Sequence, residues 1–320
     1  TLRRTSADLF VTGLRVAGIM SDEFVLPYHF TDALGKMVAR LSSRQRLEIT
    51  SYLGDDRFDF SVVNDASDEQ NLYLWQNIGL GIQYSYLISP EFSVQARGTW
   101  SRFYTEWLSS NPLQWEHIQN SLENGTLQGY FRWKSAAIGE LLAGIEDKLY
   151  GYYLNTRGFS YHPIRYPRRY PREHSFFFLI DKKFTPRIHL SVGGRGTYFS
   201  VQDTVAWSPQ ISLGFNVTDR TALTIRWGIY HQNLMTIGTE ETLLSMFNAW
   251  ISVPNTLPVM QSNQLDVSGE WRPSAGYKFS GSLFYKRLPG VIEYNVRKYT
   301  VDEPDLVQGS ARSWGVELEI

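Results

Sequence analysis

The sequence contains no cysteine among its 320 residues, which excludes a disulfide framework and any metal site built on thiolates. It also has no apolar run of about eighteen residues, the shortest that indicates a transmembrane helix. Basic and acidic residues nearly balance, with 31 Lys and Arg against 32 Asp and Glu, so the basic excess typical of nucleic-acid-binding proteins is missing. The chain begins at Thr1 without a signal peptide, and we expect it to be part of a longer protein.

Motifs that carry catalysis are missing as well. The chain has no G-x-S-x-G elbow, no H-E-x-x-H pair and no G-x-x-x-x-G-K loop. Its six histidines show no metal-ligand spacing, although His162 and His174 bracket one predicted loop. We therefore expect a protein that is not an enzyme and that holds neither a metal nor a cofactor.

The sequence is rich in aromatic residues, which make up 15% of the chain, and in alternating apolar positions. The stretch Ser208–Gln232 shows the alternation best, because two alternating arms flank the polar turn Thr218–Thr221. A lone β-hairpin is at best marginally stable in water, so this one needs neighbouring strands on both edges. The alternating apolar residues are Ile211, Leu213, Phe215 and Val217 on the first arm and Leu223, Ile225, Trp227 and Ile229 on the second.

The same pattern recurs and predicts about fourteen strands, from Ala7–Arg15 to Trp314–Ile320. Their connections alternate between short turns, such as Ser89-Pro90-Glu91, and mostly long loops. Transmembrane β-barrels have this asymmetry, with short periplasmic turns and longer outer loops. The predicted long loops are Gly54–Asn71, Glu106–Asn124, Asn155–His174 and Asn233–Ser262.

The two faces of the predicted strands differ in charge. An arginine or lysine that faces lipid in the middle of a bilayer costs about 2–4 kcal/mol, so a lipid-facing surface should be nearly free of charge. The apolar face meets this condition and carries aromatic residues beside the short turns, where membrane interfaces place them. The opposite face is polar, and we expect Arg97, Arg195, Arg226 and Lys278 to face a wet lumen. The same face also carries Arg40, Glu48, Arg132, Asp266, Glu270, Lys286 and Glu317.

These features predict an all-β fold, an antiparallel transmembrane β-barrel. Alternation by itself does not separate such a barrel from a soluble sandwich, since both have one apolar and one polar face. A large soluble β-structure with aromatic corners is therefore the alternative.

Two of the predicted loops contain helix signals. Asn111-Pro112 looks like an N-cap followed by proline at the first helical position, and Asn124-Gly125 would end that helix. A second short helix is predicted to begin at Thr239 and to include Trp250 among its apolar positions. These helices either grip a ligand or pack on neighbouring loops.

A third loop carries a tandem Arg-Tyr-Pro-Arg sequence. Each proline favours extended geometry in the tyrosine before it, so we expect a stiff cationic arm. Arginine forks suit phosphates and carboxylates, and tyrosine rings suit sugars or aromatic ligands. The arm would capture an anionic substrate or contact lipopolysaccharide phosphates; the alternative is a solvated loop that only aids solubility. The predicted binding residues are Arg165, Tyr166, Arg168, Arg169, Tyr170 and Arg172.

Five segments, in this order, resemble the barrel of TonB-dependent outer-membrane receptors, most closely those of Bacteroidota-type bacteria. They are Tyr28–Phe58, Phe176–Phe199, Ser208–Gln232, Asn263–Leu288 and Gly309–Ile320. The family's complete barrel has 22 strands around an N-terminal plug. The resemblance therefore implies that residues 1–320 are a single partial barrel domain, without the plug, the TonB box and the last strands. We expect further strands after Ile320, because a free strand edge would leave unpaired backbone groups in lipid.

The resemblance also implies a function and a location. Such receptors reside in the cell outer membrane and import a scarce nutrient, such as a siderophore, a cobalamin-like compound or a glycan. TonB would supply energy through the missing N-terminal region, and the other partners would be outer-membrane lipid, lipopolysaccharide and the small-molecule or oligosaccharide substrate. Two other functions remain open at this point: a passive porin-like channel and a soluble β-rich binding module.

Overall fold

The computed structural model describes residues 2–4, 13–14, 16–19, 28–59, 62–63, 68–110, 115–158, 165–237, 249–274, 276–295, 297–298, 300 and 302–319. In this part of the chain, the strands form one large sheet and a separate sheet of two strands. No described helix is long and apolar enough to cross a membrane.

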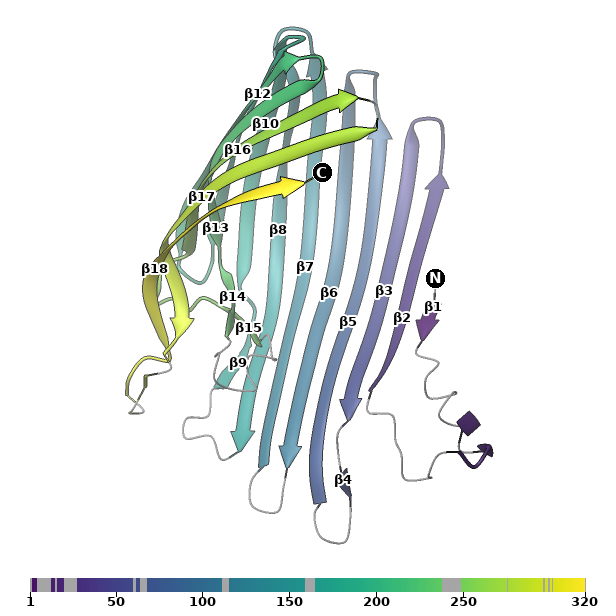
Figure 1. The fold of residues 1–320 in the computed structure, drawn as a ribbon, viewed down its shortest axis with the longest axis vertical. Helices are drawn as coiled ribbons and strands as arrows, with labels where there is room; N and C mark the ends of the chain where they lie inside the picture. Colours follow the sequence, from purple (N-terminus) through teal and green to yellow (C-terminus); the bar gives the residue numbers. More distant parts are fainter. Residues whose placement is uncertain are drawn as a thin grey trace.

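The large sheet is antiparallel, and its neighbouring strands follow one another in chain order (Figure 1). Two short strands lie off this path, since β4 pairs with β5 and β9 pairs with β8. β14 and β15 form the separate sheet. The strands are β1 (Leu2–Arg4), β2 (Tyr28–Arg40), β3 (Gln45–Asp59), β4 (Val62–Val63), β5 (Asp68–Leu87), β6 (Phe92–Ser110), β7 (Trp115–Ser135), β8 (Gly139–Gly158), β9 (Arg165–Arg169), β10 (Arg172–Thr185), β11 (Ile188–Phe199), β12 (Thr204–Thr218), β13 (Thr221–Gln232), β14 (Leu234–Ile237), β15 (Ala249–Ser252), β16 (Met260–Ser274), β17 (Tyr277–Tyr294) and β18 (Leu306–Glu319).

The hairpin predicted within Ser208–Gln232 is formed by β12 and β13. Ile211 lies opposite Trp227, so apolar side chains of the two strands share one face. At the turn, the Oγ1 atom of Thr218 accepts a hydrogen bond of 3.2 Å from the backbone N–H of Arg220. Both edges of the hairpin are occupied, by β11 and by β16, which supplies the neighbours that a lone hairpin lacks.

The predicted strands from Met37 onward all correspond to long strands of the sheet. The first predicted strand, Ala7–Arg15, does not: residues 7–12 and 15 lie outside the described residues. Gly13 and Leu14 are helical, and the backbone N–H of Ala17 donates to the carbonyl of Gly13 at 3.0 Å. The strand prediction is therefore wrong at Gly13 and Leu14.

Strands occupy most of three of the predicted loops and part of the fourth, Asn233–Ser262. Most of Glu106–Asn124 belongs to β6 and β7, whose residues pair up to Ser110 and Trp115. The first predicted helix is therefore wrong from Trp115 onward, and residues 111–114 lie outside the described part. The second predicted helix is wrong at Trp250, which is in β15 and pairs with Thr236; residues 238–248 are not described.

The sheet has two different ends. Short turns such as Pro186–Arg187 join the strands at one end, which we call the turn end and which is uppermost in Figure 1. The other connections lie at the opposite end, which we call the loop end. Strands β5 to β8 have 19 to 21 residues each, whereas β10 to β13 have 12 to 15, so the sheet is tallest at β5 to β8.

In the half next to the turn end, one face of the sheet is apolar and uncovered. We call it the outer face, and its apolar part the apolar band. Leu127 and Ile145 in this band are 67% and 69% exposed, although a soluble protein would bury such side chains. Asp147 and His174 are polar exceptions near its border, and they pair with each other. Other exposed apolar residues of the band are Leu53, Leu80, Ile82, Trp100, Phe176, Phe178, Val192, Ile211, Ile225, Leu265 and Leu283.

Nearer the loop end, strands β5 to β8 reverse this pattern. On β6, the outward sequence Trp100, Arg102, Tyr104 and Glu106 turns polar after Trp100, whereas Trp107 on the inner face is only 3% exposed. Inner-face residues of neighbouring strands, including Ile118 of β7 and Leu154 of β8, join Trp107 in a buried apolar cluster. The buried core of the described chain thus lies inside the curve of the sheet, at its loop end.

Candidate functional site

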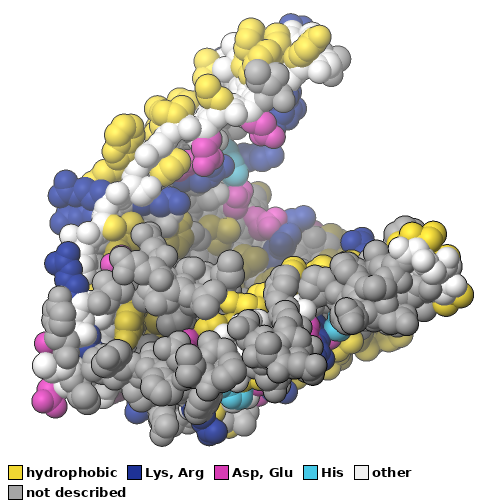
Figure 2. All heavy atoms as spheres, turned by 60° about the horizontal axis from the view of Figure 1, so that its bottom comes forward, with side chains coloured by type: hydrophobic (Ala, Val, Ile, Leu, Met, Phe, Trp, Pro, Cys, Tyr) yellow, Lys and Arg dark blue, Asp and Glu magenta, His cyan; other side chains and the backbone are white. Residues whose placement is uncertain are grey.

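The strand register places all four predicted lumen residues on the inner face. Arg97 lies opposite Gln128, Gln128 opposite Glu146, Glu146 opposite Ser175, and Ser175 opposite Thr197, so Arg97 and Thr197 share a face. Arg195 precedes Thr197 by two residues and therefore points to the same side. The register likewise places Arg226, opposite Asp266, and Lys278, two residues before Ser280, on the inner face. Figure 2 shows charged side chains gathered toward the hollow of the curved sheet.

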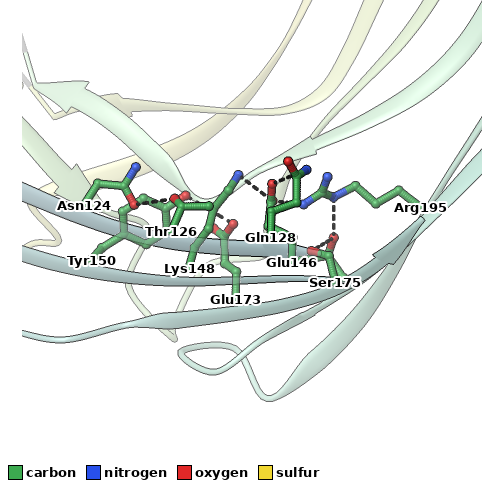
Figure 3. A network of polar contacts seen from close by, with 10 residues as sticks. Asn124, Thr126, Gln128, Glu146, Lys148, Tyr150, Glu173, Ser175 and Arg195 are labelled. Carbon is green, nitrogen blue, oxygen red and sulfur yellow. Dashed lines mark hydrogen bonds and ion pairs between the residues drawn. The ribbon is translucent and has the colours of Figure 1, made fainter. Parts of the chain in front are cut away.

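The most connected part of the inner face is a charged network on β7, β8, β10 and β11 (Figure 3). Its centre is Glu146, whose side chain is only 10% exposed. Glu146 forms an ion pair of 3.1 Å with the Nζ atom of Lys148 and accepts a 3.2 Å hydrogen bond from Gln128. It also pairs with the guanidinium of Arg195. Two cations and an amide thus compensate one largely buried carboxylate.

The network extends toward the loop end through further buried polar groups. The hydroxyl of Tyr150 donates to Oε2 of Glu173 at 3.3 Å, and both residues are buried. The hydroxyls of Ser175 and Thr197 lie 3.0 Å apart, and Nε of Arg195 donates to Thr197 at 3.3 Å. Alternate residues on three adjacent strands can meet in this way because they share a face.

Arg226 and Lys278 lie in a second, more open charged region. The guanidinium of Arg226 is 3.1 Å from the carboxylate of Asp266, and Nζ of Lys278 is 3.2 Å from that of Glu270. Both cationic side chains are more than half exposed, so these ion pairs contribute little to stability. A hollow of about 540 Å³ lies beside Arg226 and Glu270, lined mainly by small side chains. Arg97 is exposed on the inner face between Gln83 and Gln128.

The predicted cationic arm is part of the sheet rather than a free loop. Arg165–Arg169 forms β9, in which Arg165 lies opposite Asn155, Tyr166 opposite Leu154 and Arg169 opposite Tyr152. Arg168 lies within β9, and the side chains from Arg165 to Arg168 are outside the described part. Arg169, Tyr170 and Arg172 are exposed, so the arm is extended and presents two cations and a tyrosine near the loop end.

Sequence reasoning missed Glu146 and Lys148, which complete the network around Arg195. A signal was present, because both residues alternate with apolar Ile145 and Leu149 and so share the polar phase of β8. It also missed β14 and β15, which lie inside the curve of the sheet, where β15 packs against β7 and β8 and β14 contacts β17. Among the described residues, no group of three or more His, Cys, Asp or Glu side chains is arranged to hold a metal.

An antiparallel sheet with an uncovered apolar outer face and a charged inner face defines the wall of a transmembrane β-barrel. Residues 29–320 match the model of the family described as TonB dependent receptor-like, beta-barrel. The chain belongs to this family, whose barrels lie in the outer membrane of Gram-negative bacteria. This membership excludes the soluble binding module considered from the sequence.

Solved receptor structures have the same fold. The chain is similar to a mutant of the ferric enterobactin receptor PfeA of Pseudomonas aeruginosa, with a TM-score of 0.66, 12% identity and coverage of 91% of this chain and 48% of the receptor. For BauA, the ferric preacinetobactin receptor of Acinetobacter baumannii, the values are 0.60, 12%, 92% and 52%. For FauA, the alcaligin receptor of Bordetella pertussis, they are 0.58, 11%, 91% and 50%.

The chain spans about half the length of these solved receptors, and the low identity shows a shared fold rather than a shared substrate. A comparison with curated protein sequences found no match. The structure is therefore that of a partial barrel from a TonB-dependent receptor.

Proposed function

We propose that this chain is the barrel wall of an outer-membrane receptor that imports a scarce nutrient with energy from TonB. The observation that carries the proposal is the inner-face network around Glu146, in which each charge has a partner. A packed protein interior would favour apolar side chains at these positions, whereas a wet passage tolerates paired and partly solvated charges. The protein is a transporter under this proposal and performs no covalent chemistry.

The substrate under this proposal is an iron chelate. The receptors with the same fold are named for ferric enterobactin, ferric preacinetobactin and alcaligin. Arg169 and Arg172 near the loop end would attract anionic chelates, since guanidinium groups bind carboxylates and catecholates through charge-assisted hydrogen bonds. A cobalamin-like compound and a glycan are the other substrate classes that the test must include. TonB would engage a region outside this chain.

The whole cationic arm would take part in substrate capture under the proposal. Arg165, Tyr166, Arg168, Arg169, Tyr170 and Arg172 would form a capture surface for the anionic substrate, with lipopolysaccharide phosphates as the competing ligand. Arg97, Arg195, Arg226 and Lys278 would line the passage that the substrate then follows. Outer-membrane lipid would cover the apolar band.

The test is uptake of radiolabelled compounds by cells that carry or lack the full-length receptor. Ferric enterobactin and ferric alcaligin labelled with radioactive iron, and cyanocobalamin labelled with radioactive cobalt, are supplied separately, and growth on a panel of glycans is measured as well. We expect the deletion strain to lose uptake of one probe, and we expect loss of TonB in the parent strain to have the same effect. Uptake that is unchanged by the deletion for every probe would contradict the proposal.

The passive porin-like channel is the second function to be tested. It predicts uptake that depends on the receptor but not on TonB. It also predicts a steady conductance when the purified full-length receptor is inserted in a planar bilayer. A receptor that conducts steadily and needs no TonB would replace the transport proposal with the channel.

A further inference from the structure

The hairpin of β14 and β15, which we call the crossbar, runs across the inside of the curved sheet at its loop end. On one side, it packs on Ile118 of β7 and Leu154 of β8. The same buried cluster continues to Ile292 of β17 and Leu306 of β18, which are more than 130 residues further along the chain. The crossbar therefore connects opposite parts of the described wall (Figure 1).

The crossbar is deeply buried. Ile237 is 1% exposed, Met235 is 5% exposed, and Ala249, Ile251 and, directly after β15, Val253 are fully buried. Removing it from this position would expose these five side chains to the water of the outer mouth. Apolar surface of this extent strongly favours the docked position.

One side chain of the wall holds the crossbar by its backbone. The Nδ2 group of Asn120 donates to the carbonyl of Trp250 at 3.0 Å, and Oδ1 of Asn120 accepts from the N–H of Trp250 at 2.9 Å. Asn120 also donates to the carbonyl of Tyr153 at 3.0 Å and is fully buried. The amide thus pairs with β15 as a neighbouring strand would, and it leaves no backbone group of Trp250 unpaired.

A second side chain holds the chain just after β15. The Nε2 group of Gln202, in the connection between β11 and β12, donates to the carbonyl of Val253 at 2.9 Å and is 3.3 Å from that of Pro254. Asn233 donates to the hydroxyl of Ser252 at 3.2 Å, and its carbonyl accepts from the N–H of Val253 at 2.8 Å. The crossbar is therefore fixed from two directions.

We propose that the crossbar stays docked throughout transport and confines the substrate to the remaining part of the mouth, with Asn120 as the residue that positions it. This inference rests on the proposed import function. A segment that opens and closes with each substrate would need weaker packing than five nearly inaccessible apolar side chains provide. The crossbar is thus a fixed specificity element that limits the shape of what can enter.

The docked position is tested with a cysteine probe, which is unique in this chain because the chain has none of its own. Ser252→Cys is nearly isosteric, and Ser252 is 1% exposed. It is introduced into the full-length receptor after any cysteine outside this chain is replaced by serine, and intact cells are treated with a polar maleimide. We expect slow labelling, and labelling at least about tenfold faster when Asn120→Ala is added, because a buried pair of hydrogen bonds is lost.

Two variants control this measurement. Asn124→Ala removes the same side chain from the same face of β7 but does not contact the crossbar, so labelling should stay slow. Gln202→Ala loosens the crossbar from its other side and tests the idea if Asn120→Ala fails to assemble, which is judged by heat-modifiable mobility on gels. Fast labelling of Ser252→Cys alone, or slow labelling with both Asn120→Ala and Gln202→Ala, would overturn the docked position.

Whether the crossbar moves is tested by locking it. A short bis-maleimide joins Gln202→Cys to Pro254→Cys, and uptake of the iron chelate identified in the deletion assay is then measured. The reference is the same double-cysteine receptor without the cross-linker, so that both states lack the hydrogen bonds of Gln202. We expect cross-linking to leave the uptake of this variant unchanged, whereas loss of uptake on cross-linking would show that the crossbar must move. The labelling experiment needs no substrate, so absence of uptake for every probe would refute the proposed function and leave the docking result standing.

Discussion

Strands β5 to β8 can each be divided into a half next to the turn end and a half next to the loop end. The two halves place their apolar and polar side chains on opposite faces of the sheet. Next to the turn end, apolar side chains such as Leu127 and Ile145 face outward and charged ones such as Glu146 face inward. Next to the loop end, Glu106 and His117 face outward, whereas Trp107 and Ile118 face inward and are buried. The change falls on β6 between Trp100 and Arg102.

The difference follows from what surrounds each half. A membrane-spanning strand needs about 9–11 residues, and β5 to β8 have roughly twice that number. The half next to the turn end therefore crosses the lipid, and the half next to the loop end extends into water and encloses the crossbar. Backbone pairing continues without a break from one half to the other. The strand hydrogen bonds are therefore the same in lipid and in water, and only the side chains differ between the two halves.

The largest expected effect comes from the buried apolar cluster in the half next to the loop end. Trp107→Ala removes a side chain that is 3% exposed and packs on Tyr73 and Ile118, and such a change costs about 3–5 kcal/mol of stability. Trp100→Ala on the same strand is the matched control, because Trp100 is 41% exposed on the outer face and lipid can fill the space it leaves. Urea unfolding of the full-length receptor in vesicles measures both. Equal losses for the two variants would mean that the halves do not differ.

A charge introduced on the outer face tests whether lipid covers the apolar band and where this band ends. Ile145→Arg places a cation in the apolar band and should cost about 2–4 kcal/mol if lipid covers it. Leu74→Arg on β5 is the control, since Leu74 lies beyond the band and opposite Glu106, where water and a carboxylate receive the new charge. The amount of heat-resistant barrel in outer membranes reports the difference. A harmless Ile145→Arg would show that lipid does not touch this face.

The smallest effect is a pH dependence in the half next to the loop end. Burial raises the pKa of Glu106, but hydrogen bonds from His117, Tyr104 and Gln119 outweigh this and lower its pKa below the usual 4.5. A carboxyl whose pKa is depressed by folding stabilises the protein above its unfolded pKa, and this contribution is lost as the pH falls through the folded value. Burial and the hydrogen bond to Glu106 raise the pKa of Tyr104 to about 12.

Glu106→Gln measures this contribution. The variant should be less stable than the parent at pH 7, and the difference should shrink as the pH falls from about 4.5 toward 3. The readout is the melting temperature of the full-length receptor in detergent over this range. A difference that stays constant with pH would mean that the charge of Glu106 does not stabilise the half next to the loop end.

The sequence predicts the half next to the turn end well and the half next to the loop end poorly, for one physical reason. From Met37 onward, period-two alternation locates every long strand of the large sheet, because lipid on one side and water on the other impose opposite preferences on successive residues. Beyond Trp100, apolar residues move to the inner face and polar residues to the outer face. A prediction that assumes one apolar face along the whole strand therefore ends the strand at this point. Glu106–Asn124 is then mistaken for a loop with a helix, an error that Asn111-Pro112 reinforces.

The candidate site divides in the same way. Arg97, Arg195, Arg226 and Lys278 could be assigned to one face from alternation, and the strand register places them there. The pairing of Arg195 with Glu146 could not be predicted, because it depends on the relative offset of strands 49 residues apart in the chain. The docking of the crossbar could not be predicted for the same reason, because its partners come from β7, β8, β17 and β18, which are distant from it in the chain.

The contact between Asn120 and Trp250 joins residues 130 positions apart, and this sets the order in which the molecule is completed. Neither partner can meet the other until the strands between them have been added to the sheet, because closing so long a stretch of disordered chain is entropically unfavourable. We therefore expect the mouth to be wide during insertion and to acquire its final outline as one of the last events of assembly.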